Sequence, residues 1–148
     1  MPEEEVIKRA REDEREGKSP STQAGEFVRE EMEHIREGEH GARSPEQAIA
    51  IGLSKARRAG VKLAPPKRGS QQTKRQAKRD LAKGSAGGRK KPSLKRSRAT
   101  KRALKQESRR SASTQALSRH AKRVAGQRSA RSRSVAAKKA ARTRKRRR

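Results

Sequence analysis

The stretch SPEQAIAIGLSKARRAG at residues 44–60 decides the fold of the N-terminal part of the chain. Ser44 is placed to cap a helix, Gln47 completes a capping box three residues later, and Pro45 suits the first helical position. Apolar side chains then recur at helical spacing until Gly60 supplies a stop. The stretch therefore predicts a helix with one apolar face.

Two further helices are predicted before this stretch. Apolar residues at spacings near three and four predict one from about residue 22 to 37, and Gly38 ends it. Acidic residues behind a first-turn proline predict another over residues 2–16. Because the short loop over residues 39–43 joins the amphipathic helix at 22–37 to the one that follows Ser44, these two helices should form an antiparallel hairpin. The side chains expected to pack within this helical N-terminal part, or to meet a partner, are Phe27, Val28, Met32, Ile35, Ile49 and Leu53.

A hairpin of only about 40 residues is marginal alone. We expect the N-terminal helix, a second copy of the chain or another protein to cover its apolar face. Gly52 lies in mid-helix, where glycine costs about 1 kcal/mol relative to alanine. A close crossing by another helix would explain this glycine, and a neutral occurrence is the alternative.

Residues 44–60 resemble the core of a family of small bacterial and phage proteins. These proteins couple a short helical segment with the pattern QAIAIxLSxAR(R/K)AG to sequence rich in Lys, Arg, Ala and Ser, and the resemblance covers about residues 18–64. The family carries no established activity and no known site residues. The resemblance therefore supports the architecture and implies a bacterial setting, but it does not name a function.

Charge is distributed very unevenly along the 148 residues, which carry a net charge of +28. Residues 1–50 hold 14 acidic and 8 basic side chains, whereas residues 51–148 hold 36 basic and 2 acidic ones. This asymmetry predicts two functional parts, which we divide at Pro65-Pro66. The expected organisation is a helical head over residues 1–64, a flexible basic linker over 65–92 and a basic tail over 93–148.

The tail is expected to be largely disordered. Only 27% of the residues are hydrophobic, and Phe27 is the single aromatic residue. Closely spaced cations repel one another, and so few aliphatic side chains cannot offset the ordering entropy. Residues 84–88 (GSAGG) look like a hinge. The predicted fold class is thus mainly α, with a small helical head and a long, largely disordered basic tail that could form short helices on a polyanion.

Such a tail points to nucleic acid, because cations that meet phosphates release counterions. Without Tyr or Trp, the chain lacks the stacking platform of single-strand binding domains. We therefore expect non-specific binding of duplex DNA, with RNA also possible, by a histone-like protein of the bacterial cytoplasm and nucleoid. The residues expected to contact phosphates are Lys95, Arg96, Arg98, Lys101, Arg102, Lys105, Arg109, Arg110, Arg119, Lys122, Arg123, Arg128, Arg131, Arg133, Lys138, Lys139, Arg142, Arg144, Lys145, Arg146, Arg147 and Arg148.

A second function class stays open. The hairpin could be the functional surface of an interaction or assembly factor, as a homodimer or with a protein partner. The basic tail would then only localise it to RNA, ribosomes or membranes. A stable dimer of the head would favour DNA bridging by two tails.

No enzyme signature is found, and we expect no catalytic residue, cofactor, metal or small-molecule substrate. The chain has no Cys, so thiolate chemistry is excluded. His34 and His40 lie near Glu30, Glu33, Glu37 and Glu39 without the HExxH spacing, which favours a solvated helix face and a loop histidine. The adjacent carboxylates Glu30 and Glu31 are expected on the helix surface, with no pocket to perturb them. The longest near-apolar run, residues 48–53, is too short to cross a bilayer.

Overall fold

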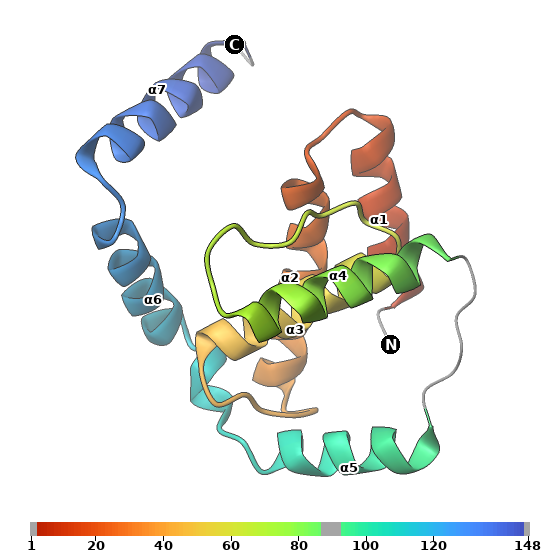
Figure 1. Cartoon of the computed structure of the whole chain (residues 1–148). Helices are drawn as coiled ribbons and strands as arrows, with labels where there is room; N and C mark the ends of the chain where they lie inside the picture. Colours follow the sequence, from red (N-terminus) through yellow and green to blue (C-terminus); the bar gives the residue numbers. More distant parts are fainter. Residues whose placement is uncertain (1–2, 87–92, 147–148) are drawn as a thin grey trace. The chain divides into compact units, whose positions relative to one another are not determined.

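The computed structural model describes residues 3–86 and 93–146, which form helices and no strand (Figure 1). Contacts divide the chain into two compact units, Met1–Ser113 and Thr114–Arg148. The first unit contains α1 (Glu4–Arg15), α2 (Pro20–Glu37), α3 (Pro45–Arg58), α4 (Gln71–Ser85), α5 (Leu94–Lys105) and the 3-10 helix η1 (Arg109–Ala112). The second contains α6 (Thr114–Gly126) and α7 (Ala130–Arg146).

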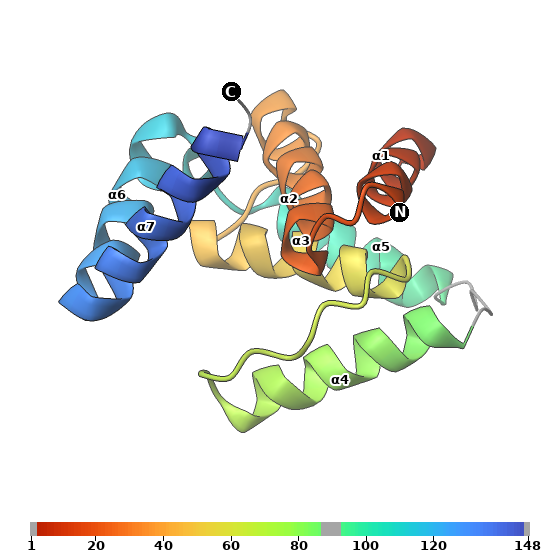
Figure 2. The same ribbon diagram turned by 90° about the horizontal axis from the view of Figure 1, so that it is seen from above.

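The first three helices lie where the sequence predicts them, and their caps explain their bounds. The Ser44 hydroxyl accepts a hydrogen bond from the Gln47 amide at 3.3 Å, as the capping box requires. Gln47 Oε1 in turn accepts from the Arg43 amide at 2.6 Å. Gly38 closes α2 with a φ of 87°, a left-handed conformation that glycine adopts without strain. The two predicted helices and the short loop between them are confirmed, but α2 crosses α3 rather than running antiparallel to it (Figure 2), so the expected antiparallel hairpin is wrong.

The apolar core of the hairpin is completed by α1. Val6, Ile7 and Ala10 of α1 are buried in one cluster with Phe27 of α2 and Ala56 of α3. Figure 2 shows α1 alongside α2, which crosses α3. Among the expected packing residues, Phe27, Ile35 and Met32 are buried. The other three, Val28, Ile49 and Leu53, are half-buried. The N-terminal helix is therefore the element that covers the hairpin.

Gly52 lies where α2 and α3 approach most closely. A Cβ atom at this position would lie 2.7 Å from the Val28 Cα and 3.1 Å from the Phe27 carbonyl oxygen. Real Cβ atoms do not come this close to a backbone, so the two helices could not cross in this way with alanine at position 52. The close-crossing explanation of Gly52 is confirmed.

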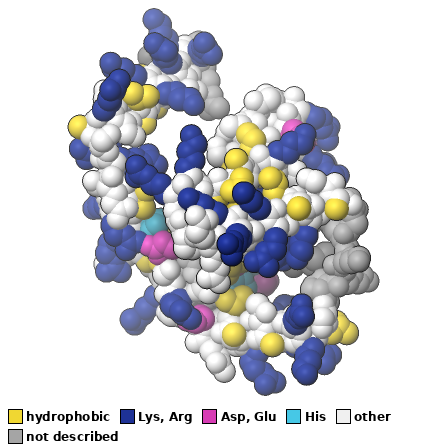
Figure 3. All heavy atoms as spheres, in the orientation of Figure 1, with side chains coloured by type: hydrophobic (Ala, Val, Ile, Leu, Met, Phe, Trp, Pro, Cys, Tyr) yellow, Lys and Arg dark blue, Asp and Glu magenta, His cyan; other side chains and the backbone are white. Residues whose placement is uncertain are grey.

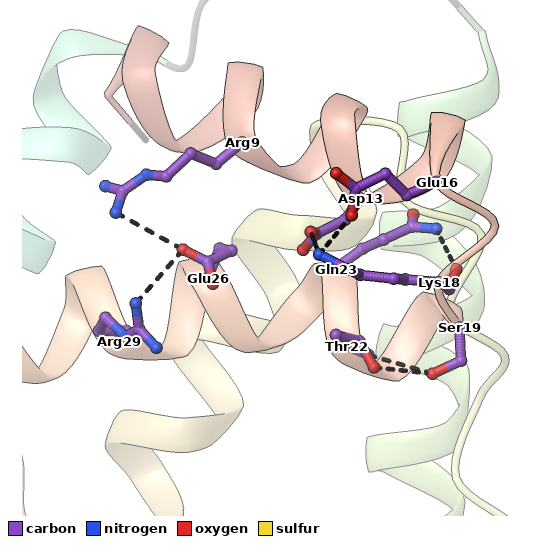
Figure 4. Close-up of polar contacts among 9 residues, drawn as sticks. All are labelled: Arg9, Asp13, Glu16, Lys18, Ser19, Thr22, Gln23, Glu26 and Arg29. Carbon is purple, nitrogen blue, oxygen red and sulfur yellow. Dashed lines mark hydrogen bonds and ion pairs between the residues drawn. The ribbon is translucent and has the colours of Figure 1, made fainter. Parts of the chain in front are cut away.

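Charged side chains arrange the turn between α1 and α2 (Figure 4). Lys18 Nζ lies 2.6 Å from Asp13 Oδ1 and 2.7 Å from Glu16 Oε2, and these hydrogen bonds raise the pKa of Lys18 above its usual range. Glu26 of α2 pairs with Arg9 of α1 at 3.6 Å and with Arg29 at 3.7 Å. Exposed pairs of this kind contribute little stability.

The expected long disordered tail is wrong. Residues beyond Pro66 form α4, α5, η1, α6 and α7. Ala, Leu, Lys, Arg and Gln are strong helix formers, and side-chain hydroxyls cap the helices: Ser70 accepts from the Thr73 amide at 3.1 Å and Ser129 from the Ser132 amide at 3.2 Å. Like charges three or four residues apart on an exposed helix cost only about 0.2–0.5 kcal/mol per pair, whereas one N-cap contributes about 1 kcal/mol. Helix propensity and capping therefore outweigh the repulsion.

The first compact unit also continues past Pro65-Pro66, because α4 packs on α3 from the side opposite to α2 (Figure 2). Asp80 of α4 is only 1% exposed. Its carboxylate accepts hydrogen bonds from Ser54 Oγ at 2.8 Å, Arg58 Nε at 2.7 Å and Gln76 Nε2 at 3.0 Å. This buried carboxylate fixes α4 on α3.

Gly84 and Arg57 complete the contact between α3 and α4. A Cβ atom at Gly84 would overlap the carbonyl oxygen of Arg57, so glycine is required here for packing rather than for a hinge. Of the expected hinge, residues 84 and 85 belong to α4, and residues 87 and 88 lie outside the described residues. The Arg57 guanidinium donates to the Leu63 and Ala64 carbonyl oxygens at 3.0 and 3.3 Å. Burial lowers its pKa, and Asp80 acts in the opposite direction.

Replacing Gly52 with alanine tests the close crossing. Gly25 is the matched control, because it lies in α2 and a Cβ atom added there would meet no other atom within 4 Å. Both substitutions gain the same helix propensity, about 1 kcal/mol. Overpacking costs about 1–3 kcal/mol, so Gly52→Ala should be less stable than Gly25→Ala by about that amount. Urea unfolding followed by far-UV circular dichroism measures the difference, and equal stabilities would contradict the crossing.

Replacing Asp80 with asparagine tests the buried carboxylate. The amide retains the volume but removes the charge that three donors share, so we expect the free energy of unfolding to fall by about 2–3 kcal/mol. Asp13→Asn removes a carboxylate from the exposed Lys18 pair and should cost less than about 1 kcal/mol. Hydrogen exchange should show the loss of protection first in α4. A similar cost for both variants would refute the anchoring role of Asp80.

Candidate nucleic-acid interface

The outer face of α4 is cationic because its acidic residue is turned inward. Arg75, Lys78, Arg79 and Lys83 of α4 are exposed, whereas Asp80 is buried. These four residues lie in the segment 65–92, which the sequence predicts to be a flexible linker, and they are not among the predicted phosphate contacts. The signal that reveals the helix is the spacing of Ala77, Asp80, Leu81 and Gly84 at i, i+3, i+4 and i+7.

A row of cations follows one face of α5. Lys95, Arg98, Arg102 and Lys105 are spaced three and four residues apart, which places them on the same side of a helix. All four are exposed. They line two open surface hollows that share Arg98 and Arg102. The structure thus brings these four predicted residues together.

Backbone hydrogen bonds attach this basic helix to the acidic head. The Gly41 amide donates to the Leu104 carbonyl oxygen at 2.8 Å, and the Ala42 amide donates to that of Ser108 at 3.1 Å. Arg36 Nε donates to the Ala112 carbonyl oxygen of η1 at 2.9 Å. A Cβ atom at Gly41 would overlap the backbone of residue 107, so the two segments lie in close contact.

The second unit is also made of basic helices. Residues 114–148 hold 14 Lys and Arg and no Asp or Glu. In α6, Arg119, Lys122 and Arg123 are exposed, whereas Leu117 and Val124 on the other face are half-buried. In α7, a helical face carries exposed cations throughout: Arg131, Lys138, Arg142 and Lys145.

All the predicted phosphate-contacting residues from Lys95 to Arg146 are exposed. Arg147 and Arg148 lie outside the described residues. Within each unit, the described basic helices present exposed Lys and Arg side chains of their own. Figure 3 shows Lys and Arg side chains over much of the visible face and few acidic ones. Within residues 93–146 the one acidic side chain, Glu107, pairs with Arg43 at 3.7 Å.

The acidic side chains of α2 differ from the prediction. Glu30 and Glu31 were expected on the surface, but their exposed fractions are 3% and 0%. His34 is buried rather than solvated, with an exposed fraction of 9%. Glu31, His34 and the loop residue His40 lie close enough together to hold a metal ion. Local spacing could not reveal this group, because the turn at Gly38 brings His40 back toward α2.

None of the described helices is long and apolar enough to cross a bilayer. Comparison with known proteins adds one finding. A family of unknown function, DUF6496, matches residues 17–68, a segment that contains α2 and α3. No curated protein and no solved structure matches the chain. The match thus covers the hairpin and ends before α4, so the basic helices lie outside the segment that resembles this family.

Proposed function

We propose that this chain binds nucleic acid, with duplex DNA as the main target, through phosphate contacts made by its basic helices. In the proposal it acts as a nucleoid-associated protein of the bacterial cytoplasm, which neutralises phosphate charge and thereby helps to compact DNA. The observation that carries the proposal is the exposure of every described Lys and Arg from residue 95 to residue 146. Glu107 is the only acidic side chain in that segment.

The length of the α5 row suits a phosphate backbone. Lys95 and Lys105 are ten residues apart, which corresponds to about 15 Å along a helix axis at 1.5 Å per residue. One DNA strand presents a phosphate about every 3.4 Å along the duplex axis. The four cations of this row can therefore meet about four phosphates of one strand. Each such contact releases condensed counterions, which favours binding at low salt.

Several features favour duplex binding without sequence preference. Phe27 is the only Phe, Tyr or Trp in the chain, and it is buried in the core, so none of these side chains is exposed for base stacking. The exposed cations are long and flexible, and they suit phosphates better than base edges.

The apolar face of the hairpin is covered by α1. We therefore rank docking of a protein partner on that face below nucleic-acid binding.

The first experiment is a titration of full-length protein against duplex DNA, single-stranded DNA and structured RNA over a salt series, followed by fluorescence anisotropy. We expect similar affinities for unrelated duplexes, with log K falling steeply as log salt rises. If ten cations meet phosphates, the slope is about −9. A strong preference for RNA would redirect the proposal to RNA. Weak binding of all three nucleic acids at physiological salt would contradict it.

A fourfold substitution on α5 tests the assigned residues. Lys95→Gln, Arg98→Gln, Arg102→Gln and Lys105→Gln together should reduce the magnitude of the salt slope by up to about 3.6, because up to four phosphate contacts are lost. The control removes the same charge from the acidic head, with the substitutions Lys8→Gln, Arg11→Gln, Arg15→Gln and Arg29→Gln. The control should leave the slope nearly unchanged. Equal effects of the two variants would show that only net charge matters and would contradict the α5 interface.

Truncation after Ser113 separates the two compact units without cutting the first. It removes 14 cations of residues 114–148. The shortened chain should keep the helices of the first unit and bind duplex DNA more weakly, with a shallower salt slope, because α4 and α5 keep their exposed cations. Undiminished affinity would exclude α6 and α7 from the interface. Circular dichroism provides the folding control.

A further inference from the structure

Glu31, His34 and His40 form a compact group of metal-ligand atoms at the end of α2. Each residue offers one nitrogen or oxygen atom, and these three atoms lie within 4.8 Å of one another. Glu31 and His34 are one turn apart on α2, so they project from neighbouring points of the helix. His40 Nε2 lies 3.2 Å from Glu31 Oε1. The group is shielded, since the side chains of His34 and His40 are 11% and 15% exposed.

The turn after α2 is what assembles the group. The amides of Gly38 and Glu39 both donate to the His34 carbonyl oxygen, at 3.1 and 3.0 Å. With Gly38 in the left-handed conformation, these bonds reverse the chain and bring His40 next to the last turns of the helix. The His34 and His40 rings meet edge to face, with centroids 6.4 Å apart.

The surroundings of the group match those of a metal centre. His40 Nδ1 lies 3.1 Å from the Gly41 carbonyl oxygen. A ring N–H donated there leaves the lone pair of Nε2 directed at Glu31, which is the usual arrangement of a metal-binding imidazole. On the other side of the carboxylate, Lys55 Nζ of α3 lies 2.6 Å from Glu31 Oε2. The lysine holds one oxygen and leaves Oε1 facing the histidines.

Burial of the Glu31 carboxylate costs free energy unless it has a further partner. Both of its oxygens are completely buried. Lys55 Nζ lies against Oε2, and His40 Nε2, at 3.2 Å, faces Oε1. The ion pair with Lys55 offsets the charge, but a buried carboxylate normally accepts several hydrogen bonds as well. A metal ion bound at Oε1 would supply the missing interaction.

Two imidazoles and a carboxylate select a borderline transition metal such as Zn²⁺ rather than Mg²⁺ or Ca²⁺, which prefer oxygen ligands. Further carboxylates stand beside His34: Glu3 Oε1 lies 3.6 Å from Nε2, and Glu39 Oε2 lies 3.9 Å from Nδ1. The position of Glu3 is fixed by its amide, which donates to Glu30 Oε1 at 2.6 Å. One of these carboxylates or a water molecule can fill the fourth position.

We propose that Glu31, His34 and His40 form a structural Zn²⁺ site that fastens the turn after α2 to the helix. The consequence reaches the basic segment, because the same turn donates the Gly41 and Ala42 amides to residues 104 and 108. A bound metal ion holds this turn in the conformation that receives α5 and η1. The competing explanation is an ion pair between a protonated His40 and Glu31, which needs no metal.

The test uses the full-length chain after treatment with a chelator and then dialysis. We expect Co²⁺ to bind at one ion per chain with the visible absorption of a tetrahedral site, and Zn²⁺ to displace it. His34→Gln and His40→Gln should each weaken Zn²⁺ binding by at least about 10- to 100-fold. The matched control His120→Gln changes the remaining histidine, which belongs to α6, and should leave the affinity unchanged.

A structural readout separates the metal site from the ion pair. Adding Zn²⁺ should slow amide hydrogen exchange at Gly41 and Ala42 in the unmodified chain and in His120→Gln, but not in His40→Gln. Because His34 and Glu31 are buried and their variants could fail to fold, the half-buried loop residue His40 decides the outcome, with circular dichroism as the folding control. If the unmodified chain binds no Zn²⁺, or if His40→Gln binds it equally well, the site does not exist.

Discussion

The close crossing of α2 and α3 at Gly52 is the contact on which the first unit depends. Since glycine has no side chain, the backbone of α3 reaches the backbone of α2 near Val28. This approach encloses Phe27 between the helices and creates the face that α1 covers. It also brings Lys55 of α3 to the buried carboxylate of Glu31 on α2. The opposite side of α3 then packs against α4. The absence of a side chain at Gly52 therefore permits the packing of α1, α2, α3 and α4.

A shortage of apolar side chains explains why the structure relies on buried charge. With 27% hydrophobic residues, the chain cannot build a large apolar core, and it buries Glu30, Glu31, Arg57 and Asp80 as well. A buried charge is tolerated only when a partner group pairs with it. Each buried charge therefore requires a particular polar group on the element that packs against it. Asp80 accepts hydrogen bonds from donors on α3, and Arg57 donates to carbonyl groups of the segment that follows α3. Polar contacts therefore determine which elements dock, and apolar burial supplies much of the stability.

The sequence reveals features that depend on local signals and conceals those that depend on tertiary contacts. The capping box at Ser44 and the glycine at 38 are local, and both helices they delimit were predicted correctly. The helix α4 was missed because its inward face contains Asp80, a residue that normally indicates solvent exposure. For α5, α6 and α7 the composition predicts a largely disordered tail that forms short helices only on a polyanion, because close cations repel one another. In the structure, propensity and capping suffice for helices in the free chain. Burial of Glu31 depends on Lys55 and His40 arriving from other segments, which no periodicity can show.

The attachment of α5 and η1 has an evolutionary consequence. The head donates hydrogen bonds to the backbone carbonyl oxygens of Leu104, Ser108 and Ala112 in this segment. A backbone carbonyl is present whatever the amino acid. Side chains along the exposed face of the segment can consequently change in identity and number without loosening the attachment. Selection on docking acts instead on the donor side, where Gly41 has no room for a side chain and Arg36 supplies its guanidinium. Divergence among related chains should thus be rapid in the basic segment and slow in the turn that holds it.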